Sequence, residues 1–224
     1  MAADLHCHTK LSDGSMGIDE IVLLAKSRGV KTLAITDHDT FAGVTRAQVC
    51  GKRHGIEVLS GVELSTYDYA RGRKAHILCY CCEHPDRLEG LCKQVGDGRR
   101  KAAEKMLRKV MQIYPIAPEI VVRRAQGSTN IFKQHIMQAL LEAGYADGLF
   151  GEVFQKLFGA KTGLAYFPIE YPDVHEVLRR VHEAGGIAVM AHPGEYDGMA
   201  LLEELAENKE IDGVEVWHPG NPEE

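Results

Sequence analysis

The chain has 224 residues, 45% of them hydrophobic, and a formal net charge of −6. This length can enclose a sizeable core, and the composition is that of a globular protein. An acidic balance argues against wholesale nucleic-acid binding, so we expect no duplex DNA partner. No run of about 18 apolar residues is present, and the N-terminus lacks the basic and apolar regions of a signal peptide. We therefore expect no membrane span and a cytoplasmic location.

The six cysteines do not indicate disulfides, because the chain is large enough to fold without them and shows no export signal. We therefore expect reduced thiols. Cys79 and Cys82 form a C-x-x-C pair, but it lies within a strand-like run and has no second pair. A structural zinc knuckle is therefore disfavoured there.

The first distinctive stretch is DLHCHTKLSDGS, at residues 4–15, which places two histidines one residue apart before an aspartate in a turn. In an extended segment, side chains alternate between two faces. His6 and His8 are therefore expected on one face, with Leu5 and Cys7 on the other. The stretch predicts two imidazoles that bind one ion together.

The following residues alternate between helical and strand patterns. Apolar residues at helical spacing predict helices at 18–28 and 41–54, each followed by a glycine. Short apolar runs predict buried strands at 31–39 and 56–65. This alternation indicates a parallel sheet with crossover helices, in which an active site forms at the carboxyl ends of the strands.

A fourth strand is predicted at 74–81, with His76 in its middle and a loop at 67–73 before it. After a long helical segment the α/β pattern resumes. Its predicted helix, strand, helix and strand lie at 172–184, 185–194, 199–208 and 212–220.

Residues 85–167 show helical periodicity throughout, which predicts a small helical insertion. We expect it to interrupt one α/β domain formed by residues 1–84 and 168–224. Between Lys93 and Lys109 the insertion holds seven Lys or Arg residues against two Asp or Glu residues. This basic run fits either an ordinary solvated helix face or a wall facing an anionic ligand.

Polar side chains gather at the ends of the predicted strands. Any one histidine among them has an ordinary structural interpretation, as a core residue with a satisfied hydrogen bond. Eight such groups at the same end of successive strands favour a metal site instead. Imidazole and carboxylate donors without thiolates suit Zn2+, Mn2+ or Fe2+ in a catalytic setting. The candidates are His6, His8, Asp13, Asp37, His38, Glu63, His76 and His192.

Five motifs, DLHCHTKLSDGS, ITDHDT, GVELS, AHIL and AHPG, together resemble the PHP (polymerase and histidinol phosphatase) superfamily. The resemblance runs nearly the whole length, because FKQHIMQALLEAGY and VFQKLFGAKTGLAYFPIEYP are similar to stretches of its single-domain phosphoesterases. Within that group, the chain most resembles enzymes acting on nucleoside 3',5'-bisphosphates, 5'-AMP-like nucleotides and short RNA ends.

The resemblance implies an α/β fold, a distorted seven-stranded (β/α) barrel with two or three divalent metal ions, Mn2+, Zn2+ or Fe2+. Carried over by motif, the metal ligands would form three groups: His6, His8 and Glu63; Asp13 and His38; Glu63, His76 and His192. In this arrangement Glu63 belongs to two groups.

The resemblance also implies roles around the ligands. Asp37 would orient a ligand imidazole without touching an ion. Lys133, His135 and His218 fall where related enzymes contact substrate phosphate; the alternative is a surface or helix-packing role. Family members carry one more strand, ending in a Ser-Asp-x-His-Gly type motif that does not occur here. We therefore expect the last barrel strand to be missing from this chain, as in a fragment of a longer protein.

These features predict a metal-dependent phosphoesterase acting on a small nucleotide or a short RNA end. Two ions bridged by Glu63 would share the attacking hydroxide, and no G-x-S-x-G motif supplies a serine nucleophile. A histidinol-phosphate phosphatase is an alternative, against which the form of the insertion argues. The pattern of ligands also fits a metal-dependent amide hydrolase, which would use the same hydroxide, and a non-catalytic metal-binding module.

Overall fold

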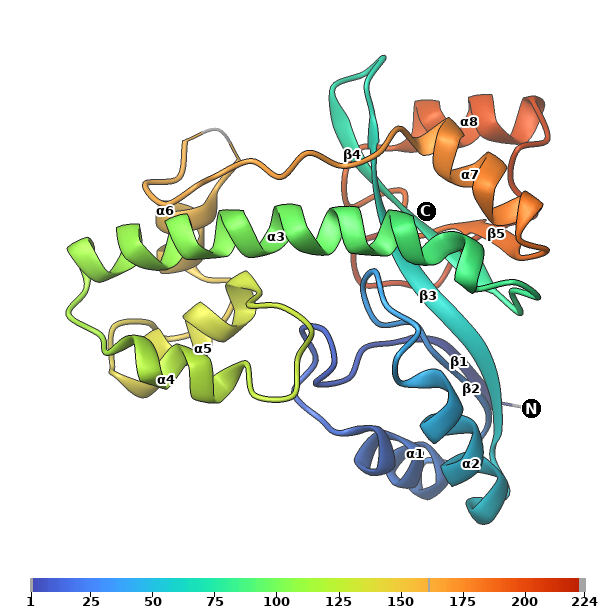
Figure 1. Ribbon diagram of the computed structural model, residues 1–224, viewed down its shortest axis with the longest axis horizontal. Helices are drawn as coiled ribbons and strands as arrows, with labels where there is room; N and C mark the ends of the chain where they lie inside the picture. Colours follow the sequence, from blue (N-terminus) through green and yellow to red (C-terminus); the bar gives the residue numbers. More distant parts are fainter. Residues whose placement is uncertain (1, 161, 222–224) are drawn as a thin grey trace.

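One curved six-stranded sheet organises the computed structural model, which describes residues 2–160 and 162–221 (Figure 1). The strands lie in the sheet in their chain order. They are β1 (Ala2–Cys7), β2 (Val30–Ile35), β3 (Glu57–Asp68), β4 (Arg73–Tyr80), β5 (Ile187–Met190) and β6 (Gly213–Val214). Strands from both ends of the chain therefore lie in one sheet, and a helical segment lies between them in the chain.

The first three strands form the parallel unit that the alternating pattern predicts. β1 pairs with β2, and β2 with β3, both in parallel. The crossover helices α1 (Ile18–Ser27) and α2 (Val44–His54) bury Val22 and Ala47 in one cluster with Leu33 of β2. Because these strands are parallel, the polar residues that follow them meet at one edge of the sheet.

β3 and β4 form an antiparallel hairpin instead of another crossover unit. β3 continues to Asp68, so the loop predicted at 67–73 shortens to a turn. Asp68 holds this turn, because its Oδ1 accepts a hydrogen bond of 3.1 Å from the Arg71 amide. In this register His76 pairs with Ser65 near the end of β3. An antiparallel strand thus brings His76 to the same edge of the sheet.

Helices α7 (Val174–Glu183) and α8 (Met199–Glu207) pack on the second half of the sheet, in one hydrophobic cluster with residues of β3, β4 and β5. α7 starts two residues later than predicted because Asp173 caps it. The Asp173 side chain accepts hydrogen bonds from the His175 and Glu176 amides, which satisfies amides that have no partner within the helix.

The last strand is much shorter than predicted. β6 pairs in parallel with β5, and the Glu215 amide adds one further bond of 2.9 Å to the Met190 carbonyl. The Asn221 side chain then donates to the carbonyls of Glu215 and Val216, which ends the strand. β1 and β6 form the two edges of the sheet. The described strands therefore form an open, distorted barrel of six strands, which agrees with a seven-stranded barrel that lacks its last strand.

Helix α3 (Asp86–Ile113) belongs to two hydrophobic cores and runs from the sheet to the other helices of the insertion (Figure 1). Leu88 and Leu91 pack in the core of the sheet. Met106 and Val110 pack in a second core, with residues of the remaining helices. These are α4 (Pro118–Arg124), α5 (Lys133–Glu142) and α6 (Glu152–Phe158). The boundary predicted at residue 85 thus falls at the start of a helix shared by both parts.

α3 is also the longest helix of the part of the chain that the structure describes, and it is strongly charged. Neither α3 nor any other described helix combines the length and apolar character needed to cross a membrane.

Shortening Leu88 or Ile136 to alanine tests whether the two cores unfold together. Both side chains are fully buried, so Leu88→Ala and Ile136→Ala should each lower the free energy of unfolding by about 3 kcal/mol. Because α3 belongs to both cores, each variant should keep a single transition in urea, followed by circular dichroism. Leu23→Ala, at a position 47% exposed, is the control and should cost less than about 0.5 kcal/mol. Two separate transitions would show that the cores are independent.

Candidate metal centre and adjoining pocket

The end of β1 and the segment that follows it bring the first polar side chains to the site. His6 and His8 lie on one face, as expected, with their Nε2 atoms 3.0 Å apart. The chain then turns back, and the amides of Ser12 and Gly14 donate to the Thr9 carbonyl. A Cβ at residue 14 would collide with the His8 carbonyl, so the turn requires glycine there.

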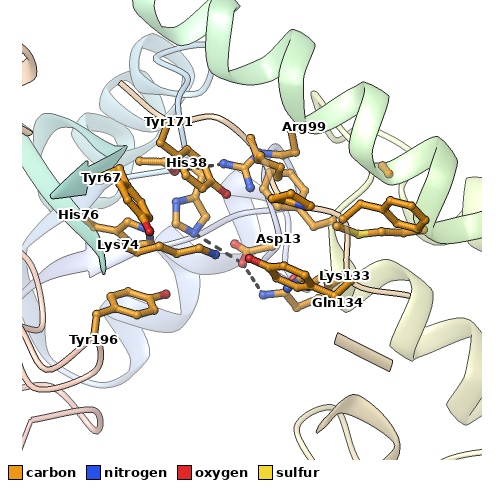
Figure 2. Close-up of a pocket in the computed structure, with 18 of the residues that line it drawn as sticks. Asp13, His38, Tyr67, Lys74, His76, Arg99, Lys133, Gln134, Tyr171 and Tyr196 are labelled. Carbon is orange, nitrogen blue, oxygen red and sulfur yellow. Dashed lines mark hydrogen bonds and ion pairs between the residues drawn. The ribbon is translucent and has the colours of Figure 1, made fainter. Parts of the chain in front are cut away.

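Asp13, within this turn, joins the loop to the helical insertion. Its Oδ1 lies 2.9 Å from His8 Nδ1, and its Oδ2 accepts a hydrogen bond of 2.8 Å from Gln134 Nε2 of α5. Oδ2 also lies 3.8 Å from His38 Nε2 (Figure 2). The insertion also contacts the loop through Ser128, whose hydroxyl donates a hydrogen bond of 2.7 Å to the Ser12 carbonyl. The insertion therefore forms part of the site.

The carboxylate of Glu63, on β3, lies at the centre of the cluster and is 1% exposed. Five imidazole nitrogens surround its two oxygens. Oε1 lies 2.7 Å from His76 Nδ1 and 2.9 Å from His192 Nε2, and Oε2 lies 2.9, 3.2 and 3.3 Å from His8 Nε2, His38 Nδ1 and His6 Nε2. A single buried carboxylate thus connects histidines from four different parts of the sheet.

The cluster keeps its carboxylates ionised. Burial would raise the pKa of the Glu63 carboxyl, but the imidazole of His76 and the hydrogen bonds of His192 and His6 hold it well below its usual range. Burial would likewise lower the pKa of His6, but the carboxylates of Glu215 and Glu63 raise it to about 9. His38 behaves differently, because burial lowers its pKa to about 3. A neutral imidazole has a lone pair available for an ion.

These donors fit divalent cations. The Nδ1 atoms of His38 and His192 are buried and form no hydrogen bond within residues 2–160 and 162–221, although buried polar atoms ordinarily have a partner. Two groups of donor atoms share Glu63, which could bridge two ions, but they place His6 with His192 and His8 with His38, whereas the resemblance implies His6 with His8 and His76 with His192. The groups whose atoms lie within 4.8 Å of one another are His6, Glu63 and His192; His8, His38 and Glu63; and His6, Glu215 and His218.

A cavity of about 600 Å³ opens beside the cluster (Figure 2). Asp13, His38 and His76 line its inner end, and aromatic side chains supply much of its wall. The volume suits a small organic ligand. The aromatic residues include Tyr67, Tyr166, Tyr171, Tyr196 and Phe154.

Three cationic side chains, Lys74, Arg99 and Lys133, also line the cavity. The Arg99 guanidinium is held in place by hydrogen bonds of 2.7 Å to the Asp39 carboxylate and 3.1 Å to the Ser65 hydroxyl. Burial and the positive charges of Lys74 and Arg99 lower the pKa of Lys133 to about 8. The cavity lining also includes the carboxylates of Asp13, Glu170 and Glu195, so an anion would bind where Lys74, Arg99 and Lys133 face the cavity and not through an overall positive charge of its wall.

The seven residues predicted as metal ligands therefore lie in one cluster, and their binding of ions stays a prediction. The three residues predicted to contact substrate, in contrast, do not lie together. Lys133 lines the cavity, but His135 does not, because it is buried and its Nδ1 accepts a hydrogen bond of 3.1 Å from the Phe132 amide at the start of α5. His218 also lies outside the cavity lining; its ring centroid is 4.7 Å from that of His192.

Asp37 also differs from expectation, because its hydrogen bonds go to the loop and not to an imidazole. Its Oδ1 accepts from the Thr9 amide at 2.7 Å and the Ser12 hydroxyl at 2.6 Å, and its Oδ2 accepts from the Thr9 hydroxyl. Ser12 Oγ lies 3.4 Å from His8 Nδ1. Asp37 is therefore connected to the histidines indirectly, through the shape of the loop and through the Ser12 hydroxyl, which lies between Asp37 and His8.

Four residues of the site were not predicted from the sequence: Lys74, Arg99, Gln134 and Glu215. Arg99 belongs to the basic run that left two interpretations open, but Val95, Ala102 and Met106 on the same helix are buried. An arginine at helical spacing within a buried stripe is the signal that could have identified it. Glu215 follows β6 directly, so the strand-end rule that found the other candidates applies to it as well.

Comparison with known proteins is consistent with this geometry. A model of the PHP domain matches residues 4–187. A phosphoribosyl 1,2-cyclic phosphate 1,2-diphosphodiesterase of Eggerthella lenta is 37% identical over 98% of this chain and 84% of its own length. A 5'-3' exoribonuclease of Escherichia coli is 35% identical over 87% of this chain and 66% of its own length. A 3',5'-nucleoside bisphosphate phosphatase of Chromobacterium violaceum is 32% identical over 90% of this chain and 70% of its own length.

Among solved structures, one described as a metal-dependent phosphoesterase from Bifidobacterium adolescentis superposes with a TM-score of 0.90 and 29% identity. It covers 100% of this chain and 79% of its own. The names of the three sequence relatives all denote hydrolases of phosphoester bonds. The chain therefore belongs to the PHP domain family and, with these relatives, to its hydrolases of phosphoester bonds.

Proposed function

We propose that this protein is a metal-dependent phosphoesterase that hydrolyses a phosphate ester of a small nucleotide or of a short RNA end. The observation that carries the proposal is a cavity that Lys74, Arg99 and Lys133 share with the proposed ligands His38 and His76. The names of the relatives support the substrate class, since they specify a phosphoribosyl cyclic phosphate, RNA and a nucleoside bisphosphate.

The seven clustered residues would hold two or three divalent ions, Mn2+, Zn2+ or Fe2+. Bound ions would lower the pKa of a water molecule and neutralise charge on the phosphoryl oxygens. Glu63 stays ionised in its buried position, and His38 stays neutral, so each is in the protonation state that a ligand needs. Asp13 stays ionised too, because the hydrogen bond and positive charge of His8 lower the pKa of its carboxyl against the effect of burial.

The three cations of the cavity would bind the substrate. Arg99 is already fixed by Asp39 and Ser65, so it loses little conformational freedom when its remaining N–H groups donate to phosphate oxygens. Lys74 and Lys133 add two further charges to the same cavity. Three cations beside a metal centre exceed the need of a single phosphate group. They favour a substrate with a second phosphate or a chain of phosphates.

Aromatic residues at the outer part of the cavity would bind the base. Phe150, which is 65% exposed, lines the cavity with Phe154, and their ring centroids lie 5.4 Å apart. Stacking of a base on an aromatic ring contributes about 1 to 3 kcal/mol and tolerates different bases. This wall favours a nucleotide over a phosphate ester without a flat ring.

We assign the attack on phosphorus to water and not to a side chain of this protein. Cys7 lies between two proposed ligands in the chain, but burial raises the pKa of its thiol well above its usual value. It also packs against the cluster that contains Val22 and Leu33, away from the cavity. The hydroxyls of Ser12 and Ser65 donate to the carboxylates of Asp37 and Asp39, so each is already engaged.

Phosphate release tests the proposal directly. With Mn2+ present, the protein should release phosphate from adenosine 3',5'-bisphosphate, or a mononucleotide from a 5'-phosphorylated oligoribonucleotide. Mn2+ at about one hundred times its Kd should raise the free energy of unfolding by about 2.7 kcal/mol. His8→Ala should abolish phosphate release and reduce the stabilisation by Mn2+, and His84→Ala, at an exposed position, should change neither. Faster turnover of histidinol phosphate or of an amide would contradict the substrate class; equal stabilisation of His8→Ala would contradict the metal centre.

Replacing Arg99 tests the anion site. Arg99→Met should lower kcat/KM for adenosine 3',5'-bisphosphate about 100-fold, because a charge-assisted bond contributes about 3 kcal/mol. Arg99→Lys keeps a charge beside Asp39 and should lose about tenfold. The side chain of the neighbouring Arg100 is 65% exposed, against 12% for Arg99, so Arg100→Met is the control. Stabilisation by Mn2+ should persist in all three variants, and an equal loss in Arg100→Met would refute the assignment.

Substrate binding should weaken as the pH rises through about 8, the pKa to which burial and two neighbouring cations lower Lys133. Above this pH Lys133 is neutral, whereas phosphate esters are already fully ionised because their second pKa is about 6. The KM should therefore rise about tenfold between pH 7 and pH 9. Lys133→Arg should hold KM low throughout, and Lys133→Met should hold it high. A rise that persists in Lys133→Met would assign the titration to another group.

A further inference from the structure

Glu215 has two partners, and both belong to the proposed metal centre. Its Oε1 lies 2.9 Å from His6 Nδ1, and its Oε2 accepts a hydrogen bond of 2.8 Å from the His192 amide. The side chain is 12% exposed. The backbone of Glu215 is itself fixed, by its bond to the Met190 carbonyl in β5 and by the Asn221 side chain. A firmly held carboxylate thus connects β1 with the segment that follows β5.

The His6 ring uses its two nitrogens for different partners. Nε2 lies 3.0 Å from His8 Nε2 and 3.3 Å from Glu63 Oε2. Donors bound about 2.1 Å from one ion lie about 3.0 to 3.4 Å apart when their bond angle is about 90° to 109°. Nε2 is therefore the atom placed to bind an ion. In that tautomer the ring hydrogen is on Nδ1, which donates a hydrogen bond to Glu215 Oε1.

The backbone at His192 also depends on Glu215. His192 has a φ of +24°, a region that non-glycine residues adopt only when the surrounding structure holds them there. The bond from its amide to Glu215 Oε2 is a contact of this kind. In this conformation His192 Nε2 lies 2.9 Å from Glu63 Oε1. Glu215 therefore fixes the direction of a second proposed ligand through the main chain.

A direct role for Glu215 as a ligand, together with His6 and His218, fits the bonds less well. The three residues lie close enough to form a group of donors. However, His218 Nδ1 accepts a hydrogen bond of 2.9 Å from the Gly220 amide. A neutral His218 therefore carries its hydrogen on Nε2, so Nε2 has no lone pair for an ion and the lone pair of Nδ1 is already used. His6 Nδ1 is likewise taken, by Glu215 itself.

We infer that Glu215 is a positioning residue of the metal centre, which orients His6 through Nδ1–H and His192 through its amide. The inference rests on the metal centre of the proposed function. A carboxylate that accepts the second N–H of a ligand histidine fixes the ring and raises its affinity for metal. One carboxylate would here serve two ligands of the same donor group, which lie near different oxygens of Glu63, so its loss should affect more than one bond to metal.

Zinc affinity, measured by competition with a chelator, tests the inference without any assay of turnover. Glu215→Ala should weaken Zn2+ binding about 10- to 100-fold, and the isosteric Glu215→Gln should weaken it less. Glu210→Gln is the matched control, because Glu210 forms the same kind of bond, 2.7 Å to His175 Nδ1, away from the site. It should leave the affinity unchanged. A loss of less than about twofold in Glu215→Ala, or an equal loss in Glu210→Gln, would overturn the inference.

A spectroscopic measurement separates orientation from general stability. In the zinc-loaded, 15N-labelled protein, His6 should show zinc bound at Nε2 and a slowly exchanging Nδ1–H proton. Glu215→Ala should lose that protected signal, and Glu215→Gln, which keeps the shape of the side chain, should retain the fold for comparison. Zinc bound at Nδ1 would overturn the inference. If His6→Ala binds Zn2+ as tightly as the wild type, the proposed metal centre fails, and the role of Glu215 fails with it.

Discussion

The burial of the Glu63 carboxylate among five imidazoles is the constraint on which the rest of the site depends. An ionised carboxylate inside a protein is costly unless positive charge and hydrogen bonds compensate for the lost water. Here the compensating groups come from β1, β4 and the segments after β1, β2 and β5. A curved sheet is what brings these segments together. Bound cations would meet the same need, with release of the imidazole protons.

The site divides its work between the two parts of the chain. The sheet and its loops supply the cluster around Glu63, and β4 supplies Lys74. The insertion supplies Arg99 from α3 and Lys133 from α5, and Gln134 ties it to Asp13. In the proposed function, the barrel would therefore supply the chemistry and the insertion most of the recognition. A change in the insertion could then alter which ester is bound while the cluster around Glu63 stays the same.

The features that the sequence predicts well are those set by local patterns. Helix and strand periodicity predicts the parallel β1, β2 and β3, and the strand-end rule accounts for six of the seven candidate ligands at one edge. The seventh, His76, reaches that edge because β4 is antiparallel to β3. The β3–β4 hairpin was not foreseen, because a turn stabilised by Asp68 and a crossover loop have similar polar compositions. The role of His135 depends on a single bond to the Phe132 amide. Arg99 reaches the site only through the tertiary packing of α3, which composition does not report.

The length of α3 has a consequence for how this protein can vary. The helix has 28 residues and is therefore about 42 Å long, and each end is packed into a different core. The helix is therefore a rigid spacer that determines the position of Arg99 relative to the histidines around Glu63. One residue added or removed before position 99 would rotate the guanidinium about 100° around the helix axis, out of the cavity. Insertions or deletions in α3 before position 99 therefore keep Arg99 in the cavity only if they add or remove close to whole helical turns.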